Sequence, residues 1–392
     1  MKNCLFVLLI SLGGSMGFLS AQTINKTLDL DGQTREYTVF LPQTYDPLTD
    51  SLPLIINMHG LGSDAFQQML YSNFNTIADT GNFIVVYPQG LTANIGGNIQ
   101  THWNANFGSG VDDVGFINRL IDQMFTDYGI DLARVYATGM SNGGYMSYHL
   151  ACQLSDRIAA IASVTGAMTF PDIANCAIDR NLPVMQIHGT VDDVVPITGT
   201  PIVNPAISEV VNFWLQHNNC TADPDTLPIE DIFTFDNASA TLFAYETCDS
   251  GSAVHYYLVD NGGHTWPGAL PIPDLGNTCL DFSASVKIWE FFNRFTHPNP
   301  RPGTIISSKD AVQDLAWGKT YPNPTTSTLK IDLEIATESV QLLDARGQAL
   351  RSIQSLSPGS TVSWELADLP AGMYLLRVKT EQGQVTQKIM KQ

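Results

Sequence analysis

The chain has 392 residues, 44% of them hydrophobic, and a formal net charge of −19 at pH 7. This length is sufficient for more than one folded domain. Such an acidic balance repels nucleic acid and anionic lipid, and it disfavours polyanionic substrates such as bare pectate. We therefore expect no nucleic-acid partner.

The first 21 residues have the pattern of a secretory signal peptide. Lys2 supplies a positive charge, residues 5–12 form an apolar segment, and Leu19-Ser20-Ala21 provides a small-residue cleavage site before Gln22. No later stretch of the sequence is long and apolar enough to span a bilayer. We expect an exported protein, secreted or held at the cell surface, with no membrane span after processing.

Residues 22–297 alternate between strand-like and helix-like segments, and their number suits one large single-core domain. The alternation predicts an α/β fold with a mostly parallel sheet covered on both faces, whose functional groups gather at the carboxyl ends of the strands. The expected strands lie at 37–41, 54–58, 83–87, 134–138, 158–164, 184–187 and 254–259, and the longest expected helices at 114–125 and 283–295.

The pentapeptide G-M-S-N-G at 139–143 fits the G-x-S-x-G nucleophile elbow. A β-branched and aromatic run precedes it and a helical stretch follows it, as a strand–turn–helix elbow requires. Glycine permits the sharp turn that exposes the central serine, because a side chain there would clash. Ser141 is therefore the candidate nucleophile, and the amide of Asn142 would face a developing oxyanion.

A matching acid and base follow in the order of the α/β-hydrolase triad. Asp192 comes just after the expected strand 184–187, and His264 comes just after the strand 254–259. A serine hydroxyl needs an imidazole to take its proton, and the imidazole needs a carboxylate to fix its tautomer. Asp193 is the alternative acid, but we interpret it as a solvated neighbour. His188 precedes the acid in the chain, so we interpret it as structural.

The remaining histidines lie in no comparable motif, and no pair has the H-E-x-x-H or Cys/His spacing of a zinc site. We therefore expect neither a metal nor a cofactor. These other histidines include His102, His149, His217, His255 and His297.

The motifs HGLG, GMSNGG, HGTVDDVVP and GGHTWPG, in this order, resemble those of polyhydroxybutyrate depolymerase-like and feruloyl esterase-like secreted enzymes, which belong with carbohydrate esterase family one. The segment V-D-D-V-G-F at 111–116 adds to a resemblance that covers residues 28–295. It implies a metal-free α/β-hydrolase that forms and hydrolyses an acyl-enzyme. The loop after residues 54–58 resembles the HG-containing loop of lipases, which implies that the backbone amides of Leu61 and Asn142 form the oxyanion hole.

Five of the six cysteines lie downstream of the signal peptide, in an exported chain where disulfides can form. The family pattern and the loop lengths suggest the pairs Cys152–Cys176 and Cys220–Cys248, which would leave Cys279 as a buried free thiol.

Two tryptophans are candidate walls of a substrate pocket. Trp266 lies two residues after His264, and Trp103 lies in a Gly/Asn-rich segment before the elbow. The alternative for Trp266 is a structural role that locks the histidine loop into the core.

Residues 298–318 begin with prolines at alternate positions, which predicts an extended linker; the alternative is a loop that wraps the preceding domain.

Residues 319–392 predict a small all-β sandwich, with strands at 329–333, 339–343, 361–366, 373–378 and 385–390. The segments YPNP, DARGQ, LPAGMY and KIMK resemble the C-terminal sorting domain of the type IX secretion system, which implies secretion machinery as a partner. A carbohydrate-binding sandwich is the alternative.

The leading functional hypothesis is an extracellular serine esterase that acts on feruloyl or acetyl esters of plant cell-wall polysaccharide. A second hypothesis is depolymerisation of a polyhydroxyalkanoate, or hydrolysis of a shorter hydroxyacid ester. A different class, a non-catalytic cell-surface binding protein that has kept the fold, is disfavoured because all three triad residues are present.

Overall fold

The computed structural model describes residues 22–46, 50–95, 97–303, 317–343, 349–380 and 383–392. The expected signal peptide, 1–21, and residues 304–316 of the expected linker lie outside the described residues. No helix within those described ranges has the length and apolar character needed to cross a membrane.

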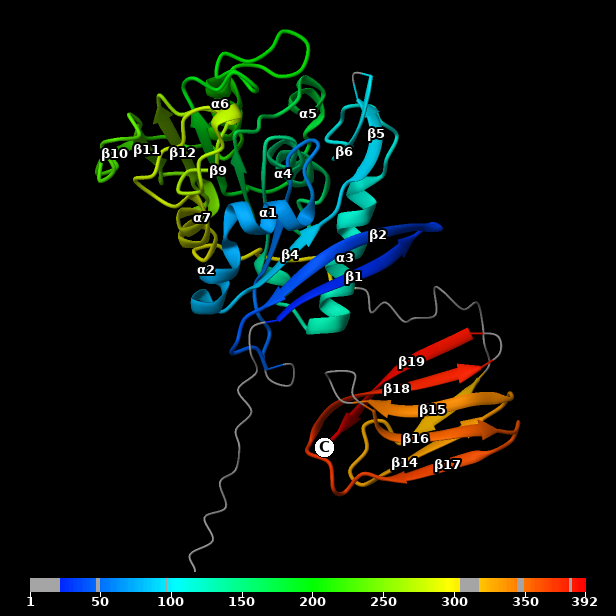
Figure 1. Ribbon diagram of the computed structural model, residues 1–392. Helices are drawn as coiled ribbons and strands as arrows, with labels where there is room; N and C mark the ends of the chain where they lie inside the picture. The colour runs from blue at the N-terminus through cyan, green and yellow to red at the C-terminus, as the bar shows by residue number, and fades with distance from the viewer. Residues whose placement is uncertain (1–21, 47–49, 96, 304–316, 344–348, 381–382) are drawn as a thin grey trace, which may run out of the picture.

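A ten-stranded sheet forms the centre of the first part of the chain, in the order β1-β2-β4-β3-β7-β8-β9-β12-β11-β10 (Figure 1). Its six central strands, from β4 to β12, run parallel, and antiparallel strands complete both edges. The strands are β1 (Gln22–Leu30), β2 (Gln33–Leu41), β3 (Leu54–Met58), β4 (Ile84–Pro88), β7 (Val135–Met140), β8 (Ala160–Val164), β9 (Val184–Gly189), β10 (Asp225–Pro228), β11 (Ser239–Tyr245) and β12 (Val254–Asp260).

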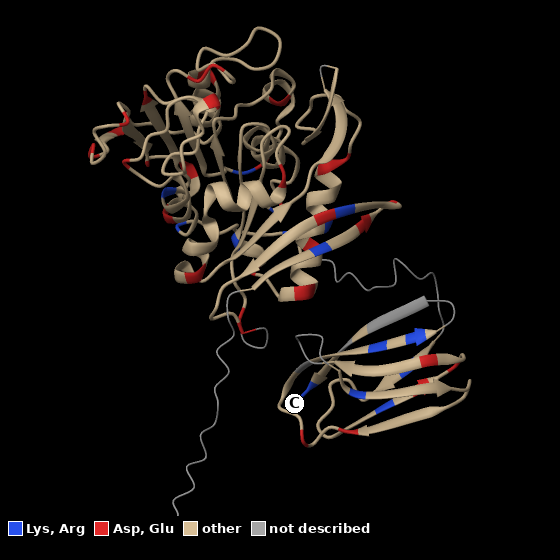
Figure 2. Cartoon of the chain, in the orientation of Figure 1, with Lys and Arg blue, Asp and Glu red and all other residues tan. Residues whose placement is uncertain are grey.

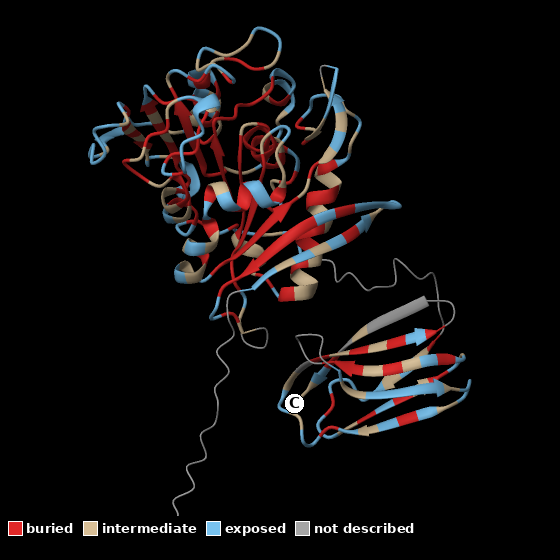
Figure 3. Ribbon diagram, viewed as in Figure 1, coloured by how far each residue is buried: buried red, intermediate tan, exposed pale blue. Residues whose placement is uncertain are grey.

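Both faces of the central strands are buried, as Figure 3 shows. Along β3, Leu54 and Ile56 join one hydrophobic cluster and Ile55 joins the other, because successive side chains point to opposite faces. Helices α3, α4 and α6 contribute to the first cluster, and α1, α2 and α7 to the second. The α-helices are α1 (Ala65–Ser72), α2 (Phe74–Gly81), α3 (Asp113–Tyr128), α4 (Asn142–Gln153), α5 (Phe170–Asn175), α6 (Ile207–His217) and α7 (Ala284–Phe292).

Local sequence signals set the ends of the helices. The Asp112 side chain accepts a hydrogen bond from the Gly115 amide at the start of α3, and Gly129, with φ 61°, ends that helix. A separate hairpin, β5 (Leu91–Ile95) and β6 (Asn98–His102), leads to the segment before α3. Short 3₁₀ turns lie at η1 (Leu132–Arg134), η2 (Asp249–Gly251) and η3 (Pro273–Leu275).

The C-terminal part of the chain is all-β. A three-stranded sheet, β13-β14-β17, and a four-stranded sheet, β16-β15-β18-β19, contribute to one hydrophobic cluster. The five expected strands are present with small shifts at their ends, and β13 and β16 were not expected. The strands are β13 (Gly318–Tyr321), β14 (Thr328–Leu333), β15 (Thr337–Leu343), β16 (Ala349–Leu356), β17 (Thr361–Glu365), β18 (Gly372–Thr380) and β19 (Gly383–Lys391).

The first residues of the expected linker are attached to the preceding part of the chain, residues 22–297, instead of forming a spacer. The Arg301 amide donates to the carbonyl of Asp156 over 2.8 Å, and its guanidinium forms an ion pair with that aspartate. Gly303 lies against Phe125 and Leu132. Residues 298–303 therefore form a loop against the preceding domain, which was the alternative to an extended linker.

Candidate active site

The nucleophile elbow has the backbone that its sequence predicts. Ser141 lies between β7 and α4 with φ 54° and ψ −118°, a conformation that a non-glycine residue adopts at a cost of about 1–3 kcal/mol. Its amide donates to the Val164 carbonyl on β8, and its carbonyl accepts from the Tyr145 amide. The strained turn is therefore held by the neighbouring strand and by the first turn of α4.

The glycines of the elbow are required by close backbone approach. A Cβ on Gly139 would lie 2.6 Å from the Gly143 carbonyl carbon, and one on Gly143 would lie 2.2 Å from the Met58 carbonyl oxygen. A Cβ on Gly60 would lie 3.5 Å from the Ser141 Cβ. The loop after β3 therefore passes directly beside the candidate nucleophile.

The expected acid and base form a buried pair. Nδ1 of His264 lies 2.8 Å from Oδ2 of Asp192, and both side chains are almost fully buried. Oδ1 of Asp192 also accepts the amides of Val194 and Val195, which fixes the carboxylate. This is the arrangement in which a carboxylate orients an imidazole and stabilises its cation.

The two competing residues lie in different surroundings. Asp193 is exposed, whereas Asp192 is buried against the imidazole, which supports Asp192 as the acid. The His188 ring is buried: its Nδ1 accepts from Gln186 Nε2, and its Nε2 donates to the Val195 carbonyl. Burial lowers the pKa of His188, so the ring is a neutral imidazole. Its bond to the Val195 carbonyl holds the loop that carries Asp192.

The histidine loop is fixed by backbone contacts. After β12, the His264 amide donates to the Leu275 carbonyl over 2.7 Å, and the Gly263 amide donates to the Asn277 carbonyl. A Cβ on Gly189, at the end of β9, would lie 2.1 Å from the Gly262 carbonyl oxygen. The acid and base loops are thus packed against each other at the carboxyl edge of the sheet.

Trp103 and Trp266 do not form open pocket walls. Their exposed fractions are 0% and 1%, so solvent reaches neither indole. The Trp103 indole stacks on Phe116, and the Trp266 indole donates to the Ser285 hydroxyl. This burial contradicts the substrate-wall interpretation and favours the structural alternative for Trp266, in which the indole anchors the histidine loop.

The HG loop after β3 contains a histidine whose role the sequence did not predict. His59 is buried, accepts the Gly90 amide at Nε2 and donates from Nδ1 to the Gly60 carbonyl. Burial lowers its pKa from 6.5 to about 4, so the ring is a neutral cross-link between the loops after β3 and β4. Leu61, the expected second oxyanion donor, follows directly in this loop.

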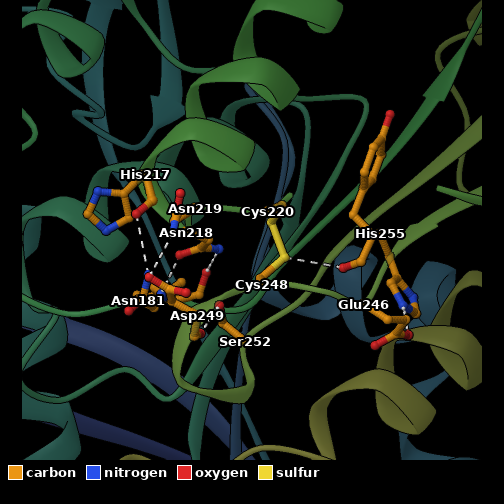
Figure 4. The surroundings of a disulfide bond; sticks show 12 residues. Asn181, His217, Asn218, Asn219, Cys220, Glu246, Cys248, Asp249, Ser252 and His255 are labelled. Atoms are coloured by element: carbon orange, nitrogen blue, oxygen red, sulfur yellow. Dashed lines mark hydrogen bonds and ion pairs between the residues drawn. A yellow bond between two sulfur atoms is a disulfide. The ribbon is translucent and has the colours of Figure 1, made fainter. Parts of the chain in front are cut away.

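The two expected disulfides are present. Cys152–Cys176 joins α4 to the end of α5, and Cys220–Cys248 joins the segment after α6 to the one after β11. Figure 4 shows the second bond, with Asn218 and Asp249 on one side and the Glu246–His255 pair on the other. Cys279 is a buried free thiol, as predicted, and burial raises its pKa to about 12.

One group of possible metal ligands occurs in the described part of the chain, where one atom each from Asp236, Cys279 and Asp281 lies within 4.8 Å of the others. The carboxylates already accept backbone amides: Asp236 accepts those of Ala238 and Leu280, and Asp281 accepts that of Phe233. These hydrogen bonds give the two carboxylates a structural role, which is to hold the backbone of the surrounding loops.

Two family models match parts of the chain. Residues 44–223 match the phospholipase/carboxylesterase family, and residues 319–392 match a secretion system C-terminal sorting domain. The chain is 28% identical over 279 residues to a bifunctional acetylxylan esterase/xylanase of Neocallimastix patriciarum, covering 71% of this chain and 36% of that protein. It is 31% identical over 206 residues to the probable feruloyl esterase C of Aspergillus clavatus, covering 51% of this chain and 68% of the relative.

Feruloyl esterase D of Neurospora crassa is 28% identical over 292 residues, covering 70% of this chain and 87% of the relative. Among solved structures, the acetyl xylan esterase from Aspergillus awamori has a TM-score of 0.46 and 15% identity, covering 69% of this chain and 99% of that one. The chain spans only about a third of the Neocallimastix protein, at 36% of its length.

The parallel sheet, the elbow at Ser141 and the buried His264–Asp192 pair define an α/β-hydrolase. The chain belongs to the esterase family that includes the feruloyl and acetylxylan esterases, and it carries a secretion system sorting domain at its C-terminus.

Proposed function

We propose that this chain is an extracellular serine carboxylic-ester hydrolase in which Ser141 is the nucleophile, His264 the base and Asp192 the orienting acid. The observation that carries this proposal is the buried hydrogen bond of 2.8 Å between His264 and Asp192. It lies at the same sheet edge as a serine held at positive φ in an elbow.

The proposed reaction proceeds through an acyl-enzyme. Oγ of Ser141 attacks the ester carbonyl carbon while Nε2 of His264 takes the hydroxyl proton, and the amides of Leu61 and Asn142 hydrogen-bond the resulting oxyanion. The tetrahedral intermediate collapses as His264 passes the proton to the departing alcohol. Water, deprotonated by the same imidazole, then attacks the acyl carbon, and Ser141 regains its proton as the acid leaves.

We propose feruloyl or acetyl esters of plant cell-wall polysaccharide as the substrate class. The names of the relatives, acetylxylan esterase and feruloyl esterase, support this class over a polyhydroxyalkanoate. The net charge of −19, with acidic residues spread over the esterase part in Figure 2, favours an uncharged acyl group and a neutral backbone over bare pectate.

We propose that export uses both ends of the chain. Residues 1–21 would direct passage across the inner membrane as a signal peptide, and residues 319–392 would be recognised by the type IX secretion machinery as a sorting domain. The mature enzyme would then be released or displayed at the cell surface, where polymeric esters are accessible.

A substrate panel tests this function. The purified protein is assayed on p-nitrophenyl acetate, methyl ferulate, acetylated xylan and poly-hydroxybutyrate, with Ser141→Ala as the inactive control. Turnover of methyl ferulate or release of acetate from xylan, lost in the control, is the expected result. Turnover of poly-hydroxybutyrate alone would replace the substrate class, and no turnover of any ester would favour a binding protein.

A further inference from the structure

The side chain of Asn142, the residue after the nucleophile, makes a two-point contact with the backbone of Trp103. Its Oδ1 accepts the Trp103 amide over 2.6 Å, and its Nδ2 donates to the Trp103 carbonyl over 3.0 Å. These contacts join α4 to the segment that follows β6, although 39 positions separate the two residues. Asn142 is buried, so water does not compete for these bonds.

The Trp103 segment is in turn bound to the loop that carries Leu61. The indole Nε1 of Trp103 donates to the His59 carbonyl over 3.0 Å, and the ring of His59 lies against that indole with centroids 5.1 Å apart. The Gly62 amide donates to the Thr101 carbonyl over 2.8 Å. Residues 101–103 therefore link the two loops that hold the proposed oxyanion donors.

We propose that the Asn142 carboxamide is a positioning residue that sets the separation of the two oxyanion-hole amides, those of Asn142 and Leu61. This inference rests on the proposed esterase function. The donors act on charge that develops only in the transition state, so their placement must exist before the reaction. A clamp that fixes the backbone on both sides of the hole supplies that placement.

The chain contains a matched control for this clamp. Asn218, at the C-terminal end of α6, accepts the Leu182 amide over 2.9 Å and donates to the Leu182 carbonyl over 2.8 Å. It is also buried, and it is labelled in Figure 4. Leu182 precedes β9 at the amino edge of the sheet, whereas the proposed site lies at the carboxyl edge. Replacing either asparagine with alanine removes an equivalent pair of hydrogen bonds, but only the Asn142 pair lies near the proposed site.

The test compares Asn142→Ala with Asn218→Ala on p-nitrophenyl acetate, with kcat expressed per site titrated by a fluorophosphonate. We expect both variants to lower the melting temperature. Only Asn142→Ala should lower kcat, by about ten- to hundredfold, with KM nearly unchanged, because a misplaced donor weakens the transition state more than the bound substrate. Its affinity for an arylboronic acid, which forms a tetrahedral adduct at the serine, should fall by a similar factor.

Trp103→Phe is a second variant that leaves Asn142 in place and removes the indole donor to the His59 carbonyl. It should also lower kcat and boronate affinity with little change in KM, even if Asn142→Ala fails to fold. Equal effects of the two asparagine variants on kcat, or full activity of both Asn142→Ala and Trp103→Phe, would overturn the inference while the wild type still hydrolyses esters. A wild type that hydrolyses no ester and reacts with no fluorophosphonate would instead overturn the proposed function.

Discussion

His264 and Asp192 lie 72 positions apart in the sequence, yet Nδ1 of the imidazole is 2.8 Å from Oδ2 and 3.1 Å from Oδ1 of the carboxylate. The parallel pairing of β9 with β12 brings their loops together. The contact fixes the imidazole through Nδ1, so that Nε2 is the nitrogen left to exchange a proton with a serine.

Asp192 and its neighbour Asp193 form a matched pair for testing the acid. Asp192→Asn should lower kcat by about 10⁴-fold, because the amide favours the wrong tautomer of His264. Asp193→Asn should have little effect, since its carboxylate is exposed. Steady-state kinetics on p-nitrophenyl acetate measure both variants, and a crippled Asp193→Asn enzyme would show that the acid is misassigned.

Two buried neutral histidines predict how stability depends on pH. Burial lowers the pKa of His59 from 6.5 to about 4, and it also lowers the pKa of His188. These two side chains therefore take up protons at a higher pH in the unfolded chain than in the folded chain. The stability that the neutral imidazoles contribute is complete above pH 6.5 and is lost as the pH falls toward 4. For His59 that loss is on the order of 3 kcal/mol.

Urea unfolding between pH 7 and pH 4.5 measures this loss, and His59→Gln provides the comparison. Glutamine offers a donor and an acceptor to the Gly60 carbonyl and Gly90 amide but does not titrate, so its free energy of unfolding should depend less on pH. A variant with the wild-type pH dependence would show that His59 is not the titrating group.

The motifs were enough to name the residues of the candidate site, because an elbow needs glycines and a triad needs Asp and His after particular strands. Order along the chain was enough to choose Ser141, Asp192 and His264 as candidates, and the family pattern was enough to pair the cysteines. The contacts made by the side chains of Asn142, His59 and Trp103 could not be predicted. They depend on which backbone groups lie opposite one another across loops, and sequence spacing does not record that.

The sequence did not predict strands β16 and β1 because their apolar residues do not form an unbroken alternating pattern. Strand β16 is mostly exposed and lacks the alternation of apolar residues that marks a half-buried strand. Edge strand β1, which was not expected either, alternates in burial, but only Ile24, Leu28 and Leu30 are apolar on its inner face and its other side chains are polar. Residues 298–303 were expected to be part of a spacer because of their prolines. In the structure, the Arg301 guanidinium binds the side chains of Asn118 and Asp156 instead.

We predict that residues 319–392 are required for delivery and dispensable for catalysis. A truncated variant should end after Gly303, because His297 donates to the Ser155 carbonyl and Arg301 contacts Asp156. It should hydrolyse small esters at about the full-length rate and remain in the periplasm of the native host. Poor activity on small esters, or arrival in the medium, would contradict this; loss on insoluble substrate alone would favour a carbohydrate-binding domain.

Covalent labelling with a fluorophosphonate tests the assignment of the nucleophile most directly. We predict one adduct per wild-type chain, mapped by peptide mass spectrometry to Ser141, and no adduct and no ester turnover in Ser141→Ala. Because Ser141 is partly exposed at the elbow, the substitution should leave the melting temperature nearly unchanged. An adduct on another residue, or near-normal turnover by a folded Ser141→Ala protein, would show that Ser141 is not the nucleophile.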